Sequence, residues 1–144
     1  MRIALLCVPA GRGTALAACA QALARGMEAG GHRAELLDLR NGERLPGYDY
    51  VAVLAEQCSL FGGRMPEALA QVLASGRALA GRKGAAFLRK TGPFTSRGLV
   101  NLMKAMEREG MVINWSEVIL SMAHAEALGR SAPPMMKSKT ETDG

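Results

Sequence analysis

The feature that most constrains this chain is a repeated alternation between short apolar runs and segments with helical periodicity. The first apolar run, 3–8, contains no charged residue and ends at Pro9. An uninterrupted run of this kind is typical of a strand that is buried on both faces. Four later segments are also predicted to be strands: 33–39, 50–55, 84–88 and 111–120. We expect the last of these strands to be broken near Asn114.

Helical spacing of apolar residues occupies most of the intervals between the strands. Thr14 is placed to cap the first helix, which Gly30 and Gly31 end. Its apolar residues recur at helical spacing: Leu16, Cys19, Leu23 and Met27. Pro66 suits the first position of a second helix, because a proline there loses no hydrogen bond, and this helix ends by Gly81. The inward residues of the second helix are Leu69, Val72 and Leu73.

A third helix is predicted from about Ser96 to Gly110. Its apolar face comprises Leu99, Leu102, Met103 and Met106. A short last helix is expected at 123–128. From Ser131 onward the chain is polar, with two adjacent prolines and alternating charges, so we expect a mobile tail at 131–144.

Buried strands that alternate with helices predict a parallel sheet with helices on both faces. Because right-handed crossovers leave few topologies, the expected fold is an α/β, three-layer, doubly wound five-stranded parallel sheet. The chain has 144 residues, 49% of them hydrophobic, which suits a single domain at 1–130 with a substantial core. Such folds bind ligands at the carboxyl ends of their strands. The candidate site therefore involves three loops, 9–13, 56–65 and 89–95.

The formal net charge of +5 comes from scattered basic residues, with no run of five or six and no interleaved aromatic residues. This pattern predicts no specific nucleic-acid binding. No stretch approaches the roughly 20 apolar residues of a transmembrane helix, so we expect no membrane insertion. The three cysteines form no C-x-x-C pair, and the two histidines lie far apart without an acidic cluster, so no metal site is predicted. A reducing cytoplasm is the expected compartment.

The segment Leu16-Ala17-Ala18-Cys19 is similar to a bacterial lipoprotein cleavage box. Gly11-Arg12-Gly13 contradicts that interpretation, because it places a charge and two helix-breaking residues inside the supposed apolar segment. Cleavage would also remove the predicted first strand. We therefore interpret the segment as part of the first helix.

The layout of the chain resembles that of the flavodoxin family over about residues 1–130. Besides the apolar first strand and the Gly/Thr loop after it, the resemblance rests on four segments at corresponding places: 47–50, 61–66, 80–84 and 109–112. The resemblance implies the strand order 2-1-3-4-5 and a non-covalent FMN that serves as a one- or two-electron carrier. It also implies that no side chain acts as acid, base or nucleophile, because the cofactor carries the reaction.

In the family, the first loop holds the FMN phosphate through backbone N–H groups at a helix start, glycines and hydroxyls. The corresponding residues here are Pro9, Ala10, Gly11, Arg12, Gly13 and Thr14. Only Thr14 offers a hydroxyl and Pro9 has no N–H, whereas Arg12 can supply a compensating charge. A tight strand-to-helix turn with a capping threonine explains the same residues.

The second loop corresponds to a segment that flanks the flavin ring in the family. Its residues are Gln57, Cys58, Ser59, Leu60, Phe61 and Gly62. Phe61 can stack on the ring, or Leu60 can pack its aliphatic surface against it. Alternatively, both side chains fill the core beneath the loop.

The third loop corresponds to the family segment whose backbone meets the polar edge of the flavin. Its residues are Thr91, Gly92, Pro93, Phe94 and Thr95. Gly92 permits a close approach, and Phe94 can form the second wall of the ring site. Alternatively, Phe94 packs at a helix entry that Thr95 or Ser96 caps.

Three other functions stay open at this level. Cys7 followed by Arg12 resembles the Cys-x5-Arg loop of low-molecular-weight phosphatases, but the spacing is one residue short and a convincing Asp-Pro acid loop is missing. A flavin-dependent NAD(P)H or quinone reductase usually needs longer insertions than 144 residues allow. A flavodoxin-like domain that has lost FMN and serves as a binding or assembly module agrees with the sparse phosphate loop and the positive charge. The expected partner is a redox protein or a second copy of the chain.

Overall fold

The computed structural model describes residues 2–8, 14–37, 48–56, 79, 81–90 and 95–131. Its strands are β1 (Arg2–Val8), β2 (Arg33–Leu37), β3 (Tyr50–Ala55), β4 (Lys83–Arg89) and β5 (Val112–Ile119). Its helices are α1 (Ala15–Ala29), α3 (Thr95–Arg108) and α4 (Met122–Arg130). Apart from the buried Leu79, the helix predicted from Pro66 lies outside the described residues, as does the tail after Ser131.

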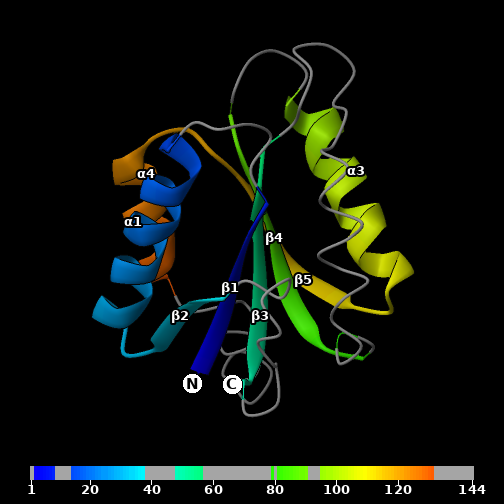
Figure 1. The fold of residues 1–144 in the computed structure, drawn as a ribbon, viewed down its shortest axis with the longest axis horizontal. Coiled ribbons are helices and arrows are strands. Elements are labelled where there is room, and N and C mark those ends of the chain that lie inside the picture. Colours follow the sequence, from blue (N-terminus) through cyan, green and yellow to red (C-terminus); the bar gives the residue numbers. More distant parts are fainter. Residues whose placement is uncertain are drawn as a thin grey trace, which may run out of the picture.

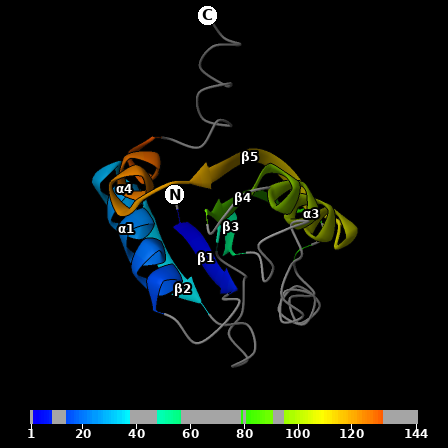
Figure 2. The same cartoon turned by 90° about the horizontal axis from the view of Figure 1, so that it is seen from above.

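The five strands form one sheet in the order β2-β1-β3-β4-β5, and every neighbouring pair is parallel. Figure 1 shows α1 and α4 against one face and α3 against the other, and Figure 2 shows the same three layers from above. The doubly wound fold and the strand order that the resemblance implies are thus confirmed. Because the strands are parallel, they all end at one side of the sheet, here named the carboxyl edge.

Two apolar cores lie on the two faces of the sheet, because successive side chains of a strand point in opposite directions. In β1, Leu5 packs on the α1 face, whereas Leu6 packs in the core that contains Leu102 of α3. All six residues of β3 are buried, which explains its uninterrupted apolar sequence. The apolar face predicted for α1 is buried as expected: Leu16, Cys19, Leu23 and Met27.

The irregularity expected near Asn114 is a β-bulge in β5. The register with β4 shifts after Ile113, so that Asn114 has no partner residue in the ladder. Its side chain instead accepts a hydrogen bond from the Tyr50 hydroxyl. Directly after the bulge, Trp115 packs edge to face against Phe87, with 4.9 Å between the ring centroids. The bulge therefore directs the Trp115 ring into the core beneath α1.

Helices α1 and α4 pack closely through glycines. A Cβ atom on Gly26 would lie 2.0 Å from the carbonyl oxygen of Glu126, and one on Gly129 would lie 2.2 Å from that of Leu23. Beside this contact, the Arg25 side chain donates a hydrogen bond of 3.3 Å to the Glu126 carboxylate. The first and the last described helices are thus in direct contact.

Two residues predicted to lie in a loop belong to regular elements in the structure. Arg89, expected in a loop, is the last residue of β4 and pairs with Ile119 of β5. Thr95, expected at the end of the same loop, is the first residue of α3. In both cases the regular element continues one residue further than its apolar pattern indicates. Within the described part of the chain, no helix is long and apolar enough to cross a membrane.

Candidate functional site

The sequence places the candidate site at the carboxyl edge, and the structure describes two of its predicted residues, Thr14 and Thr95. The other predicted contacts lie outside the described residues and stay predictions: 9–13, 57–62 and 91–94. β1 ends at Val8 and α1 begins at Ala15, so the first predicted loop joins these two elements. The start of α1 is therefore the part of the predicted phosphate site that the structure describes.

Thr14 occupies the N-cap position of α1, but its side chain makes no capping hydrogen bond. The prediction that Thr14 caps this helix is therefore wrong. Its backbone angles, φ −97° and ψ −1°, are near helical, whereas a capping hydroxyl normally reaches the first turn from extended backbone. The side chain is exposed, and the first turn of α1 carries no acidic residue. This helix start consequently offers a hydroxyl and a positive helix terminus that no carboxylate in the first turn neutralises.

Thr95 is the second predicted contact that the structure describes. It is buried and begins α3, on the opposite face of the sheet from α1. The two predicted contact residues that the structure describes therefore belong to two different layers of the fold.

A charged pair that the sequence analysis did not identify lies at the ends of β3 and β4. Glu56 directly follows β3, and Arg89 ends β4. Glu56 Oε2 accepts hydrogen bonds from Arg89 Nε at 3.1 Å and from Nη2 at 2.8 Å. Glu56 is only 7% exposed, and a carboxylate this buried needs a cation and hydrogen bonds to replace its lost hydration. The only signal in the sequence was a charged residue at the end of each of two apolar runs.

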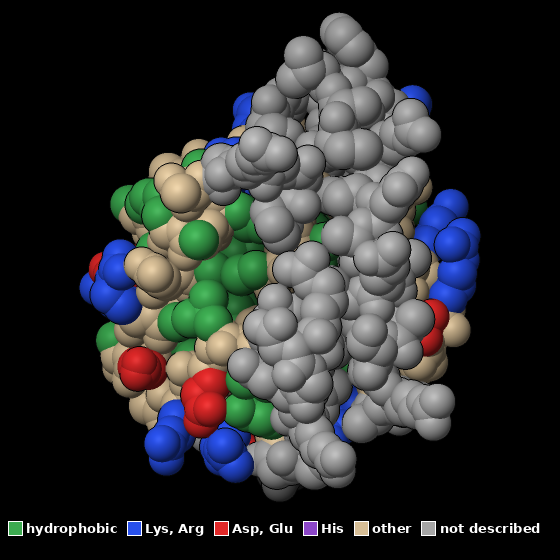
Figure 3. Space-filling view, viewed as in Figure 1, with side chains coloured by type: hydrophobic (Ala, Val, Ile, Leu, Met, Phe, Trp, Pro, Cys, Tyr) green, Lys and Arg blue, Asp and Glu red, His purple; other side chains and the backbone are tan. Residues whose placement is uncertain are grey.

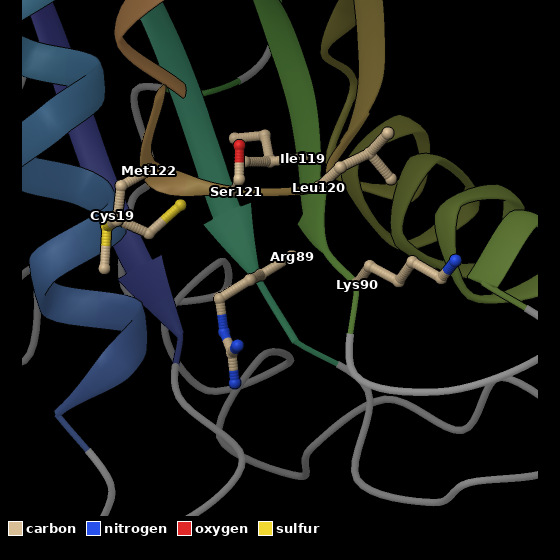
Figure 4. Close-up of a pocket in the computed structure, with 7 residues that line it drawn as sticks. All are labelled: Cys19, Arg89, Lys90, Ile119, Leu120, Ser121 and Met122. Carbon is tan, nitrogen blue, oxygen red and sulfur yellow. The ribbon is translucent and has the colours of Figure 1, made fainter. Parts of the chain in front are cut away.

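A cavity of about 170 Å³ lies between α1, the end of β4 and the connection from β5 to α4. Its lining is shown in Figure 4 and comprises Cys19, Arg89, Lys90, Ile119, Leu120, Ser121 and Met122. In this view the Arg89 guanidinium extends past the end of β3, whereas the Lys90 ammonium points to the opposite side, toward α3. Leu120 is 64% exposed and Met122 is 44% exposed, so the cavity opens beside apolar side chains.

Two of the three cysteines, Cys7 of β1 and Cys19 of α1, are described, and both pack in the core beneath α1. Burial raises the pKa of the Cys7 thiol to about 12 and also raises that of Cys19. Near neutral pH both are therefore thiols, and Cys7 lacks the thiolate character that the phosphatase alternative requires. Among the described residues, no group of three or more His, Cys, Asp or Glu side chains could hold a metal ion.

These features define the class of the protein. It is an open, doubly wound α/β protein with a buried charged pair, a cavity and the N-terminus of α1 at the carboxyl ends of its strands, where this class binds ligands. Within this class the chain has the flavodoxin-like fold, as comparison with solved structures shows. No family model matches the sequence, and no curated protein matches it.

Three solved structures illustrate the likeness. A flavodoxin from the domain Archaea matches with a TM-score of 0.65 and 17% identity, over 95% of this chain and 99% of that protein. Flavodoxin 1 from Bacillus cereus matches with a TM-score of 0.63 and 14% identity, over 90% of this chain and 95% of the other. The flavodiiron protein from Giardia intestinalis matches with a TM-score of 0.60 and 15% identity, over 99% of this chain but only 38% of that chain. Identities this low show a shared fold, and the function has to be argued from the site.

Proposed function

We propose that the protein binds FMN at the carboxyl edge and acts as an electron carrier. The observation that carries this proposal is the start of α1, where Thr14 offers an exposed hydroxyl and the first turn contains no acidic residue. A phosphate monoester binds well to such hydroxyl and N–H donors at a helix N-terminus. The flavodoxin-like fold adds support, because the structures that share it include flavodoxins.

The residues proposed to contact FMN suit it in chemical type. The proposed phosphate contacts are 9–14, and the proposed contacts to the ring are 57–62 and 91–95, with Phe61 and Phe94 as its walls. When bound, FMN would supply the one- or two-electron chemistry. The residues of the chain bind the phosphate, orient the ring and exclude water from it, and none is assigned as an acid, base or nucleophile.

A second function, as a flavin-free binding or assembly module, is favoured by a different observation. Leu120 and Met122 expose much of their apolar surface beside the cavity. The last described helix, α4, has only nine residues and begins at Met122. Apolar side chains exposed around a cavity are typical of a contact site for another molecule. In this case the bound molecule would be another protein or a second copy of the chain.

For the electron carrier, we propose a redox partner with an acidic contact surface and a cytoplasmic location. The formal net charge of +5 supports this choice of partner, because opposite charges accelerate association. On the face shown in Figure 3, Lys and Arg side chains of the described residues are spread around the periphery with acidic ones among them. This distribution favours general attraction to an acidic surface over one strongly charged contact patch.

A titration of the purified protein with FMN separates the two functions. The electron carrier is expected to take up FMN stoichiometrically, to quench flavin fluorescence and to show a measurable reduction potential. No uptake in equilibrium dialysis would contradict the proposal and favour the binding module. Sedimentation of the same sample then shows whether the chain associates with itself.

A further inference from the structure

We propose that Arg89 binds the phosphate of FMN and that Glu56 holds its guanidinium in place. This inference rests on the proposed function. It assigns a cation from β4 to a role for which the sequence suggests Arg12 alone.

Arg89 lies on the appropriate face of the sheet. Leu88 packs in the core that contains Leu102 of α3, so strand alternation places the Arg89 side chain on the face that α1 covers. Figure 4 shows its guanidinium reaching past the end of β3 at the carboxyl edge. Arg89 and Cys19, which is in the second turn of α1, line the same cavity. Arg89 therefore lies across this cavity from the N-terminal half of the helix whose start is proposed to receive the phosphate.

Both members of the Glu56–Arg89 pair shift the pKa of the Cys19 thiol. Burial raises its pKa most strongly, the Arg89 charge lowers it, and the Glu56 charge raises it. Both charges thus act at the second turn of α1.

Glu56 holds one part of the guanidinium in advance of binding. Arg89 Nε and Nη2 both donate to Glu56 Oε2, and within the described residues Nη1 has no hydrogen-bond partner. A guanidinium has five N–H donors, so it can bind a carboxylate along one edge and a phosphate along another. A side chain that is already held in place loses less conformational entropy when the ligand binds.

A cation supplied by the sheet would compensate for a first loop with few donors. Pro9 has no N–H group, and Thr14 carries the only hydroxyl in the segment 9–14. A guanidinium can bind a phosphate through two parallel N–H···O bonds, and it adds a positive charge that a hydroxyl lacks. One guanidinium can therefore replace more than one missing hydroxyl.

The test compares FMN with riboflavin, which has the same ring and ribityl chain but no phosphate. Arg89→Gln is expected to weaken FMN binding by about tenfold or more and riboflavin binding by less than about threefold. Lys104→Gln is the matched control, because it removes one positive charge from an exposed position of α3, on the opposite face of the sheet from α1. We expect this control to bind both flavins as the unmodified chain does.

A second variant keeps the test decisive if Arg89→Gln unfolds. Arg89→Gln removes the guanidinium that pairs with the buried Glu56 carboxylate, whereas the double variant Glu56→Gln/Arg89→Gln removes both charges. The double variant is expected to show the same selective loss of FMN affinity. If the unmodified chain prefers FMN and the double variant keeps that preference, this inference fails and the proposed function stands. If the unmodified chain binds neither flavin, both fail.

Inorganic phosphate is the third ligand in the test, because a free anion could use the same guanidinium. We expect phosphate to compete with FMN for the unmodified chain but not for Arg89→Gln. If phosphate binds through Arg89 and neither flavin binds, Arg89 belongs to a site for a free anion, and its role toward FMN is overturned.

Discussion

The Cα atom of Gly129 in α4 lies 2.9 Å from the position that a Cβ atom would occupy on Gly26 of α1. A Cβ atom on Gly129 would likewise lie 2.9 Å from the carbonyl carbon of Gly26. The two helices therefore touch backbone to backbone, and any side chain at either position would force them apart.

We expect Gly129→Ala to lower the free energy of unfolding by about 1–3 kcal/mol, because its methyl group would overlap the Leu23 carbonyl oxygen. In a helix without this contact, the same change would raise stability by about 1 kcal/mol, so the sign of the change in a urea titration is decisive. Gly30→Ala is the control, since the nearest atom to its Cβ position is 3.0 Å away and a smaller loss is expected. A Gly129→Ala protein with unchanged stability would mean that α1 and α4 lie further apart.

Thr14 and Ser121 precede α1 and α4, but only the Ser121 hydroxyl caps its helix, by accepting a hydrogen bond of 3.1 Å from the His124 N–H. Thr14→Val should therefore lower the free energy of unfolding by less than about 0.5 kcal/mol while weakening FMN binding several-fold. Ser121→Ala should lower the free energy of unfolding by about 1 kcal/mol, because it removes the cap of α4. Denaturant unfolding and FMN titration of the same preparations measure both quantities. A loss of stability without a loss of affinity in Thr14→Val would make its hydroxyl purely structural.

The stability of the protein should fall as the pH drops below about 6.5, because burial lowers the pKa of His32 from its ordinary value of 6.5. Below pH 6.5 the unfolded chain takes up a proton at His32 that the folded protein resists, so acid favours unfolding until the folded pKa is passed. Urea titrations at about pH 7.5 and about pH 5.5 measure this difference. The His32→Asn variant has no titrating ring at this position, so its stability should differ less between the two pH values. If its stability differs as much as that of the unmodified chain, His32 is not the source of the pH dependence.

Cys7 and Cys19 should react slowly with iodoacetamide in the folded protein. Burial raises the pKa of both thiols, and the thiolate is the reactive form. A Cys58→Ser variant leaves these two as the only cysteines, and mass spectrometry then compares the labelling rates of folded and denatured protein. Rapid labelling of Cys7 in the folded state would restore the possibility of a nucleophilic role.

The sheet was predictable because each buried strand needs an uninterrupted apolar segment. β1 and β3 are neighbours inside the sheet, and their bounds differ from the predicted ones by no more than one residue. The break near Asn114 was also predictable, since a polar residue interrupts an otherwise apolar strand. These features depend on local composition, which a single sequence shows directly.

Features that depend on contacts between distant segments were not predictable. The Glu56–Arg89 pair requires β3 and β4 to be neighbours in a particular register, and the Gly26–Gly129 contact requires α1 and α4 to share one face. The capping role predicted for Thr14 was wrong, because its backbone angles are near helical and its side chain makes no capping hydrogen bond. The remaining residues of the three predicted loops lie outside the described residues, so their contacts to FMN stay predictions.

The contact between α1 and α4 also matters during synthesis. Arg25 and Glu126, which pair beside the glycines, are 101 positions apart in the chain. A ribosome therefore completes α1 long before the helix that covers its glycine surface exists. A polypeptide truncated before Gly129 would leave that surface of α1 uncovered, which makes it a natural client for chaperones and proteases.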